Sequence, residues 1–184
     1  MRTRTLEERT IHAGRRFDFV RLTLAGSDGE VFVKEGVRHP GAVCILPLIQ
    51  APGARTRVVL IRNERVVPGK ELVEIPAGTR EPGEPPDLTA GRELEEETGY
   101  RAATLRPLGR FYTTPGLTDE LMWAYVATGL THVGQRLESD EHLTVSECSI
   151  PEVLAMLDDR RIEDAKTMLT LLLAVRAGLL SIGE

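Results

Sequence analysis

Residues 78–100 read GTREPGEPPDLTAGRELEEETGY, and the interpretation of the whole chain starts from this stretch. Its acidic residues follow a loop rich in proline and glycine. At helical spacing, Glu93, Glu96 and Glu97 fall on one face, because residues three and four apart are neighbours on a helix. No lysine or arginine follows within one turn, and like charges at this spacing destabilise a helix. A divalent cation would turn the repulsion into attraction, so the pattern predicts a metal site.

The same stretch contains the signals that begin and end a helix. Pro85-Pro86-Asp87 suits the start, because proline fits a first turn and aspartate suits a cap. Gly99 suits the left-handed residue that follows a helix. The ELEEE run by itself is more typical of a solvated acidic face. The longer pattern favours the metal site instead.

This stretch resembles the Nudix box, G-x5-E-x7-R-E-U-x-E-E-x-G-U, in which U is a bulky apolar residue. The residues at the defined positions are Gly78, Glu84, Arg92, Glu93, Leu94, Glu96, Glu97, Gly99 and Tyr100. Tyr100 is the least typical, because that position is more often aliphatic. The resemblance implies an α+β fold of the Nudix type, an α/β/α sandwich around a mixed β-sheet, in which the box forms a loop, a helix and a second loop.

Composition places the chain among ordinary globular proteins. It has 184 residues, 41% hydrophobic and 28% charged, which is enough for one domain and a small accessory element. The net charge of −5 argues against nucleic acid as a partner. The most apolar segment, 168–182, is interrupted by Arg176 and is too short to span a membrane. Cys44 and Cys148 cannot form a disulfide framework, so we expect buried thiols in a cytoplasmic protein.

Alternating and β-branched runs predict strands at 17–24, 31–37, 41–49, 57–61, 71–75, 105–113, 121–127 and 143–150. Helices are expected in the box and at 152–159 and 164–179. A GSDG turn cluster at 26–29 joins the first two strands into a hairpin. We therefore predict an N-terminal β-hairpin extension at residues 1–39 and a Nudix hydrolase domain at residues 40–184.

The resemblance also implies roles at the metal site. In Nudix enzymes the glutamates that match Glu93, Glu96 and Glu97 are metal ligands, and the residue that matches Ala77 often adds its backbone carbonyl. The expected cofactor is Mg²⁺, with Mn²⁺ as the alternative, because carboxylate oxygens suit these cations. Such a cation orients and activates water beside a phosphate. Arg92 is expected to orient the glutamates.

The general base is expected in the acidic stretch 137–142. Related enzymes often supply a glutamate from a loop at this place. Glu141 is the first candidate, because it lies closer to the strand that begins at Leu143, and Glu138 is the second. A solvated loop is the alternative. For Glu84, a contact with the metal site and a bracing role in the loop both stay open.

Two further segments resemble the ADP-ribose pyrophosphatase branch of the family. Residues 74–78 read EIPAG and residues 114–120 read TPGLTDE, with Pro115 at a distance beyond the box that is typical of this branch. Leu117 departs from the pattern, where phenylalanine is more usual. The implied function is Mg²⁺-dependent hydrolysis of the pyrophosphate bond of ADP-ribose or a related nucleoside diphosphate sugar, giving AMP and a sugar phosphate.

The resemblance assigns substrate contacts as well. Glu120 matches a residue that faces the terminal ribose, and Gly116 lies in the same loop, which an ordinary turn would also explain. Arg65 stands where the branch often shows Gln-x-Arg, so a phosphate or ribose contact and an exposed loop arginine are alternatives. Arg38 and the hairpin match strands that pack across a two-fold dimer, so a homodimer is expected.

Two other functions compete with this one. A triphosphate-sanitising pyrophosphatase is disfavoured by the TPGLTDE segment and by the long N-terminal hairpin. A non-catalytic Nudix-fold nucleotide-binding module generally loses box glutamates, and this chain keeps them all.

Overall fold

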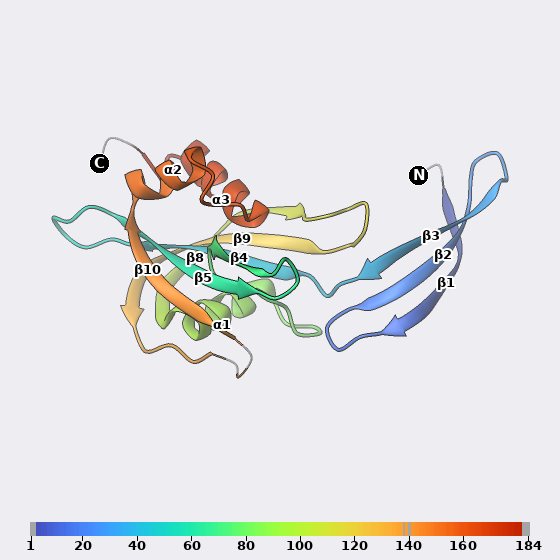
Figure 1. Ribbon diagram of the computed structural model, residues 1–184, viewed down its shortest axis with the longest axis horizontal. Helices are drawn as coiled ribbons and strands as arrows, with labels where there is room; N and C mark the ends of the chain where they lie inside the picture. The colour runs from blue at the N-terminus through green and yellow to red at the C-terminus, as the bar shows by residue number, and fades with distance from the viewer. Residues whose placement is uncertain (1–2, 138, 140, 182–184) are drawn as a thin grey trace. The chain divides into compact units, whose positions relative to one another are not determined.

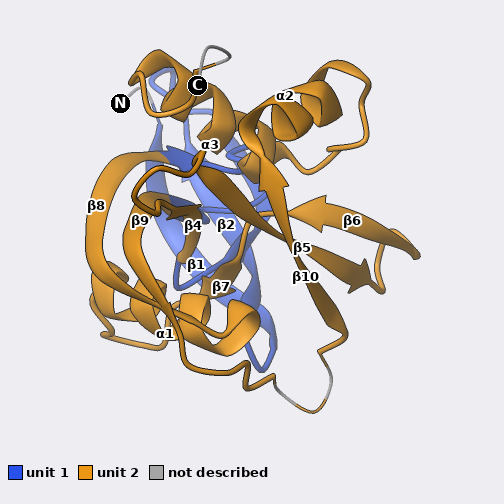
Figure 2. Ribbon diagram, turned by 90° about the vertical axis from the view of Figure 1, so that its left-hand side faces the viewer, with its two compact units in different colours: residues 1–41, 111–122 blue, residues 42–110, 123–184 orange. Residues whose placement is uncertain are grey.

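The structure is a computed structural model that describes residues 3–137, 139 and 141–181. The strands in this part of the chain are β1 (Arg4–Ala13), β2 (Asp18–Ala25), β3 (Val31–Arg38), β4 (Ala42–Ile49), β5 (Arg57–Arg65), β6 (Lys70–Glu74), β7 (Ala77–Thr79), β8 (Tyr100–Tyr112), β9 (Leu121–His132) and β10 (Leu143–Ser149). The helices are α1 (Pro86–Thr98), α2 (Ile150–Asp158) and α3 (Ala165–Arg176) (Figure 1). The chain divides into unit 1, residues 1–41 and 111–122, and unit 2, residues 42–110 and 123–184 (Figure 2).

Unit 2 is built on a sheet with the strand order β10-β5-β4-β9-β8, to which β6 adds beside β5 and β7 beside β4. Helix α1 covers one face of this sheet, and α2 and α3 cover the other (Figure 1). Strand β4 is buried almost throughout, which accounts for its continuous apolar run. The core between α1 and the sheet contains Val43, Ile45, Ala90, Leu94, Tyr125 and Ala127. This packing fixes the helix that carries the glutamates.

Unit 1 contains an antiparallel sheet with the order β1-β2-β3, together with residues 111–122. Strands β2 and β3 confirm the predicted hairpin to within one residue at each end. Strand β1 was not predicted. All of its residues are exposed and most are polar, so its strand conformation depends on backbone pairing with β2 and not on burial.

The other predicted elements are confirmed with shifted ends. Strand β8 begins at Tyr100, five residues earlier than expected, and β5 and β9 run further than expected. The short strand β7, which begins within the EIPAG segment and ends at Thr79, was missed. The predicted buried thiols are confirmed, since Cys44 and Cys148 are both buried and free. In the described part of the chain, no helix combines the length and apolarity needed to cross a membrane.

Candidate active site

Helix α1 carries the acidic stretch, and its two ends match the signals in the sequence. Pro85 occupies the N-cap position and Pro86 the first helical position, while Asp87 lies in the first turn. Gly99 ends the helix with a left-handed φ of 73°, and its N–H donates to the carbonyl of Glu95 at 2.9 Å. The predicted helix is confirmed, but Pro85 and not Asp87 forms the cap.

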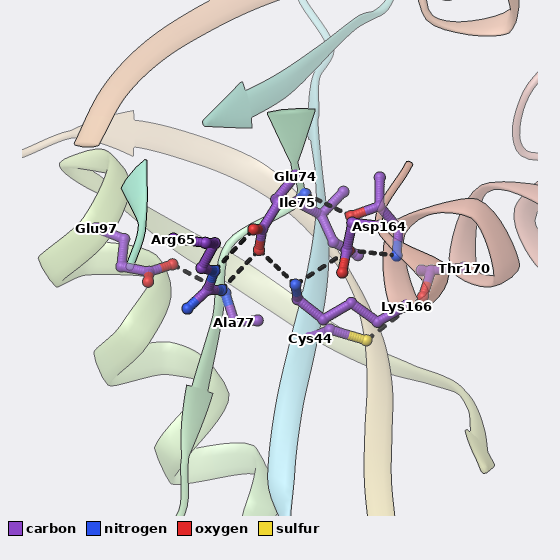
Figure 3. Close-up of polar contacts among 10 residues, drawn as sticks. Cys44, Arg65, Glu74, Ile75, Ala77, Glu97, Asp164, Lys166 and Thr170 are labelled. Carbon is purple, nitrogen blue, oxygen red and sulfur yellow. Dashed lines mark hydrogen bonds and ion pairs between the residues drawn. The ribbon is translucent and has the colours of Figure 1, made fainter. Parts of the chain in front are cut away.

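Glu97 is a buried carboxyl group held by the backbone of the preceding loop. It is only 4% exposed, and its Oε2 atom accepts a hydrogen bond of 2.8 Å from the N–H of Ala77 (Figure 3). Burial raises the pKa of Glu97 to about 8, and the charges of Glu93 and Glu141 act in the same direction. Near neutral pH this group can therefore exchange its proton for a bound cation.

Glu93 lies one turn earlier, and its carboxyl group rests against Gly78. A Cβ atom on Gly78 would lie 1.9 Å from the Cδ atom of Glu93. The backbone of Gly78 does not have a positive φ, so glycine is required here for space and not for conformation. Burial raises the pKa of Glu93 to about 7, although the neighbouring Arg92 opposes the shift.

Arg92 gathers several carboxylates around its guanidinium group. Its Nη1 atom lies 2.8 Å from Glu93 and 2.9 Å from Glu96, and its Nε atom lies 3.3 Å from Glu84. The expectation that the acidic face lacks a neutralising cation was therefore wrong, because the residue just before Glu93 reaches along that face. Glu84 also accepts a hydrogen bond of 3.1 Å from the N–H of Glu81, which favours the bracing role in the loop.

Glu141, which lies two residues before β10, acts through its charge on the same carboxylates. The charge of Glu141 contributes to the raised pKa values of both Glu93 and Glu97, which places Glu141 in their neighbourhood. Glu138, the second candidate for the general base, lies outside the described residues. Glu141, the first candidate for the base, is thus near enough for its charge to act on two of the candidate metal ligands, and its role stays a prediction.

The loop that follows β9 is hydrogen-bonded to the C-terminal end of α1. The N–H of Arg136 donates to the carbonyl of Glu96 at 2.9 Å, and the side-chain amide of Gln135 donates to the carbonyl of Glu97 at 2.6 Å. Carbonyls at a helix end have no partner within the helix, so the loop satisfies them. Sequence reasoning missed this contact, because Gln135 and Glu97 are 38 residues apart and no local pattern marks the pair.

The chain matches a known family over most of its length. The family model described as NUDIX domain matches residues 38–171. The chain belongs to the Nudix family. An ADP-ribose pyrophosphatase of Bacillus subtilis (strain 168) is 35% identical over 171 residues, which cover 89% of this Nudix chain and 90% of the relative.

Two further comparisons extend this result. A methanol dehydrogenase activator of Bacillus methanolicus is 39% identical over 144 residues, covering 77% of the Nudix chain and 76% of the relative. A solved structure titled "Crystal structure of ADP compounds hydrolase" has a TM-score of 0.81 at 24% sequence identity, covering 97% of the Nudix chain and 95% of that structure. This likeness confirms the predicted α+β fold, with a mixed sheet between helices.

The Nudix helix offers ligands suited to a hard divalent cation. Nudix hydrolases in general need such a cation, typically Mg²⁺. The candidate ligands are oxygen atoms throughout, namely the carboxylates of Glu93, Glu96 and Glu97 and the carbonyl of Ala77, and this set fits Mg²⁺ or Mn²⁺. Among the described residues, no three acidic, histidine or cysteine side chains converge on one point. The ligand chemistry therefore fits, and the side chains held by Arg92 would have to turn toward the ion.

Arg65 lies in a strand of the Nudix domain and not in a loop. It is the last residue of β5, and its Nε and Nη2 atoms donate to the carboxylate of Glu74 at 2.8 and 2.7 Å (Figure 3). Arg65 is therefore not a loop residue, but its side chain is still 41% exposed, and its contact with the substrate stays a prediction. The pKa of Arg65 is raised chiefly by its hydrogen bond to Glu74, and the charge of Glu97 contributes.

The remaining candidates for substrate contact belong to unit 1. Arg38 binds Glu8 at 2.6 Å and Asp119 at 2.9 Å. The Oε1 atom of Glu120 lies 3.6 Å from the Nε2 atom of His39. Gly116 has open space around its α-carbon, and it lines a groove of unit 1 together with Arg38. These three candidates form a group within unit 1, whereas the metal-site candidates form a group within unit 2.

Proposed function

We propose that this Nudix protein hydrolyses the pyrophosphate bond of ADP-ribose or a related nucleoside diphosphate sugar. The products would be AMP, or another nucleoside monophosphate, and a sugar phosphate. The observation that carries the proposal is the pair of buried carboxyl groups, Glu93 and Glu97, on a helix with every box residue in place. The ADP-ribose pyrophosphatase relative, which is matched over most of both chains, supports this choice of substrate class.

The residues of α1 and the loop before it would hold a divalent cation, Mg²⁺ or Mn²⁺. Glu93, Glu96 and Glu97 would bind it through carboxylate oxygens, and Ala77 through its carbonyl. When bound, the cation neutralises charge on the diphosphate and lowers the pKa of water. Arg92 is proposed to orient the glutamates, since its guanidinium group contacts the carboxylates of Glu93 and Glu96 directly.

Glu141 is proposed as the general base. What supports this is that its charge acts on both Glu93 and Glu97, since a general base has to lie within hydrogen-bond reach of the water proton, directly or through one other water. The oxygen of that water then attacks one phosphorus atom, the bridging P–O bond breaks, and the bond electrons leave with the second phosphate. The proton taken by Glu141 balances the step.

Four residues are proposed to contact the substrate. Arg65 has a fixed guanidinium group on the side of Glu97, which suits a diphosphate oxygen. Arg38, Gly116 and Glu120 are proposed for the adenosine and the terminal ribose. Arg38 and Gly116 line one groove in unit 1, which supports grouping them.

The test of the proposed function is a substrate panel with a matched variant. ADP-ribose, GDP-mannose and 8-oxo-dGTP are incubated with the protein and Mg²⁺ or Mn²⁺, with EDTA as the negative control. We expect AMP from ADP-ribose, and little product with Glu97→Gln. If 8-oxo-dGTP is the preferred substrate, the protein is a triphosphate-sanitising pyrophosphatase. If no substrate yields a monophosphate, the enzymatic proposal fails and a nucleotide-binding module becomes the better description.

We further propose a homodimer formed through unit 1. The sheet β1-β2-β3 exposes large apolar side chains, and these are Leu6, Ile11, Val31 and Val33. Contiguous exposed apolar patches mark protein interfaces, and we propose that these side chains contribute to such a patch. Light scattering after size exclusion should give twice the chain mass of 20.3 kDa, and Val33→Asp should reduce it to that value. A wild-type monomer would contradict the proposal.

Two expectations stay predictions. The first is the division of the chain into an N-terminal extension at residues 1–39 and a Nudix domain at residues 40–184. Residues 111–122 group with the N-terminal sheet. A cytoplasmic location is the other, and the buried free thiols of Cys44 and Cys148 are compatible with it.

A further inference from the structure

Helix α3 contacts the segment that joins β6 to β7, and this segment leads directly to Ala77. The backbone N–H of Ile75 donates to the hydroxyl oxygen of Thr167 at 3.0 Å, and both residues are fully buried. Asp164, the N-cap of α3, accepts the N–H of Thr167 at 2.9 Å and also its hydroxyl hydrogen. The hydroxyl group is donor and acceptor at once, so its orientation is fixed.

The side chain of Glu74 holds the same segment one residue earlier. This carboxylate is fully buried and accepts hydrogen bonds from Arg65 and from Lys166 (Figure 3). The Nζ atom of Lys166 also lies 3.0 Å from Asp164. Buried charges are costly unless they are paired, and here two cations face two anions. The network therefore holds α3 against the segment without leaving an uncompensated charge.

The held segment ends at the candidate metal site. The carbonyl of Pro76 accepts a hydrogen bond of 2.9 Å from the N–H of Ile45, and the N–H of Ala77 donates to Glu97 at 2.8 Å. Only Pro76 separates Ile75 from Ala77, and the proline ring restricts its backbone rotation. A displacement at Ile75 is therefore passed on to Ala77.

We propose that Thr167, supported by Asp164 and Lys166, is a positioning residue of the catalytic centre, although it lies in the C-terminal helix and outside the box. It fixes the backbone from Ile75 to Ala77, so that the amide of Ala77 meets Glu97 and its carbonyl faces the divalent cation. This inference rests on the proposed function, because it assigns a role toward the cation that the box would hold.

Two threonines of α3 provide a matched test. Thr170 lies one turn after Thr167 and is equally buried, but its hydroxyl contacts the thiol of Cys44 at 3.4 Å. Thr167→Val removes the acceptor of a buried backbone N–H, which is costly to leave unpaired. Thr167→Ser keeps that acceptor. Thr170→Val makes the same chemical change without exposing a backbone group, so it controls for packing.

The first measurement is the affinity for Mn²⁺. Electron paramagnetic resonance detects the bound Mn²⁺, and no substrate is present. We expect Thr167→Val to bind Mn²⁺ about 10-fold more weakly than wild type, the scale seen when the support of a metal ligand is lost. Thr167→Ser and Thr170→Val should match wild type, and kcat for ADP-ribose should follow the same order. Equal Mn²⁺ affinity in Thr167→Val and Thr170→Val would overturn the inference and leave the proposed function intact. A wild-type protein that neither binds Mn²⁺ nor cleaves ADP-ribose would overturn both.

A second measurement uses the wild-type protein and does not depend on a variant that folds. Coupling between two sites is reciprocal, so an ion that benefits from the contact between Thr167 and Ile75 must also stabilise that contact. Saturating Mn²⁺ should therefore slow amide hydrogen exchange at Ile75 and Thr167 more than at Leu171 and Ala174 in the same helix. A uniform change along α3, or none, would overturn the inference.

Discussion

Replacing Glu97 with glutamine should slow turnover strongly and, in the metal-free protein, raise stability. The ordinary pKa of a glutamate side chain is 4.5, which applies to Glu97 in the unfolded chain, and burial raises the pKa of Glu97 to about 8 in the folded protein. The folded state therefore keeps a proton that the unfolded state loses, so the stability due to this group is complete below pH 4.5 and is lost as pH rises toward 8. At 1.36 kcal/mol per pKa unit, the loss at pH 8 is about 4 kcal/mol, and at pH 5 it is below about 1 kcal/mol. These are upper limits, because Glu93 titrates in the same range.

Glutamine has no charge to lose, and its side-chain oxygen can still accept the hydrogen bond from Ala77. Urea unfolding is measured in EDTA through the fluorescence of Trp123. At pH 8 the urea midpoint of Glu97→Gln should be higher than that of wild type. This advantage should shrink at pH 5. Glu96→Gln removes the same charge from a half-exposed position paired with Arg92, so it should give no such gain.

The same Glu97→Gln variant should lose at least about 100-fold in kcat with Mg²⁺, the scale of one lost electrostatic contact to a transition state. A lower urea midpoint than wild type at pH 8 would refute the argument from buried charge. Turnover at the wild-type rate would show that the carboxylate is dispensable for the metal.

Three further substitutions probe the same site. Glu141→Gln should lower kcat by about 100-fold and flatten the acidic limb of the pH–rate profile, while the affinity for Mn²⁺ stays unchanged. A decrease in kcat below about threefold would reject Glu141 as the base. Gly78→Ala should keep the fold but displace the carboxyl group of Glu93, whose Cδ atom lies 1.9 Å from the new Cβ, so isothermal titration calorimetry should show weaker Mn²⁺ binding than in wild type. Arg92→Lys keeps the charge but not the planar fork, so kcat should fall about 10-fold with little change in the urea midpoint, and full activity would contradict the orienting role.

Local patterns were enough to predict the helix that carries the site. The signals for its start, its end and its acidic face all lie within residues 78–100, so the helix could be predicted from this segment alone. The apolar strand β4 was predicted for a similar reason, because a run of buried β-branched and aliphatic residues is a local signal. Strand β1 gave no such signal, since it buries nothing and is a strand only through pairing with β2.

The contacts that hold the site in place are non-local, and the sequence does not reveal them. Thr167 and Ile75 are 92 residues apart, and neither residue type suggests the other. Arg92 was assigned an orienting role by resemblance, but the argument from charge spacing looked only at the residues after the glutamates. The long arginine side chain reaches both Glu84 in the loop and Glu96 one turn ahead.

Arg92 gives helix α1 a built-in counter-ion. A divalent ion that enters among Glu93 and Glu96 competes with a guanidinium group already seated there, so part of its attraction is offset by the ion pairs that it replaces. Such competition favours weak, reversible metal occupancy that follows the concentration of free Mg²⁺ in the surroundings. The enzyme would then lose activity gradually when Mg²⁺ becomes scarce, while its folded structure persists.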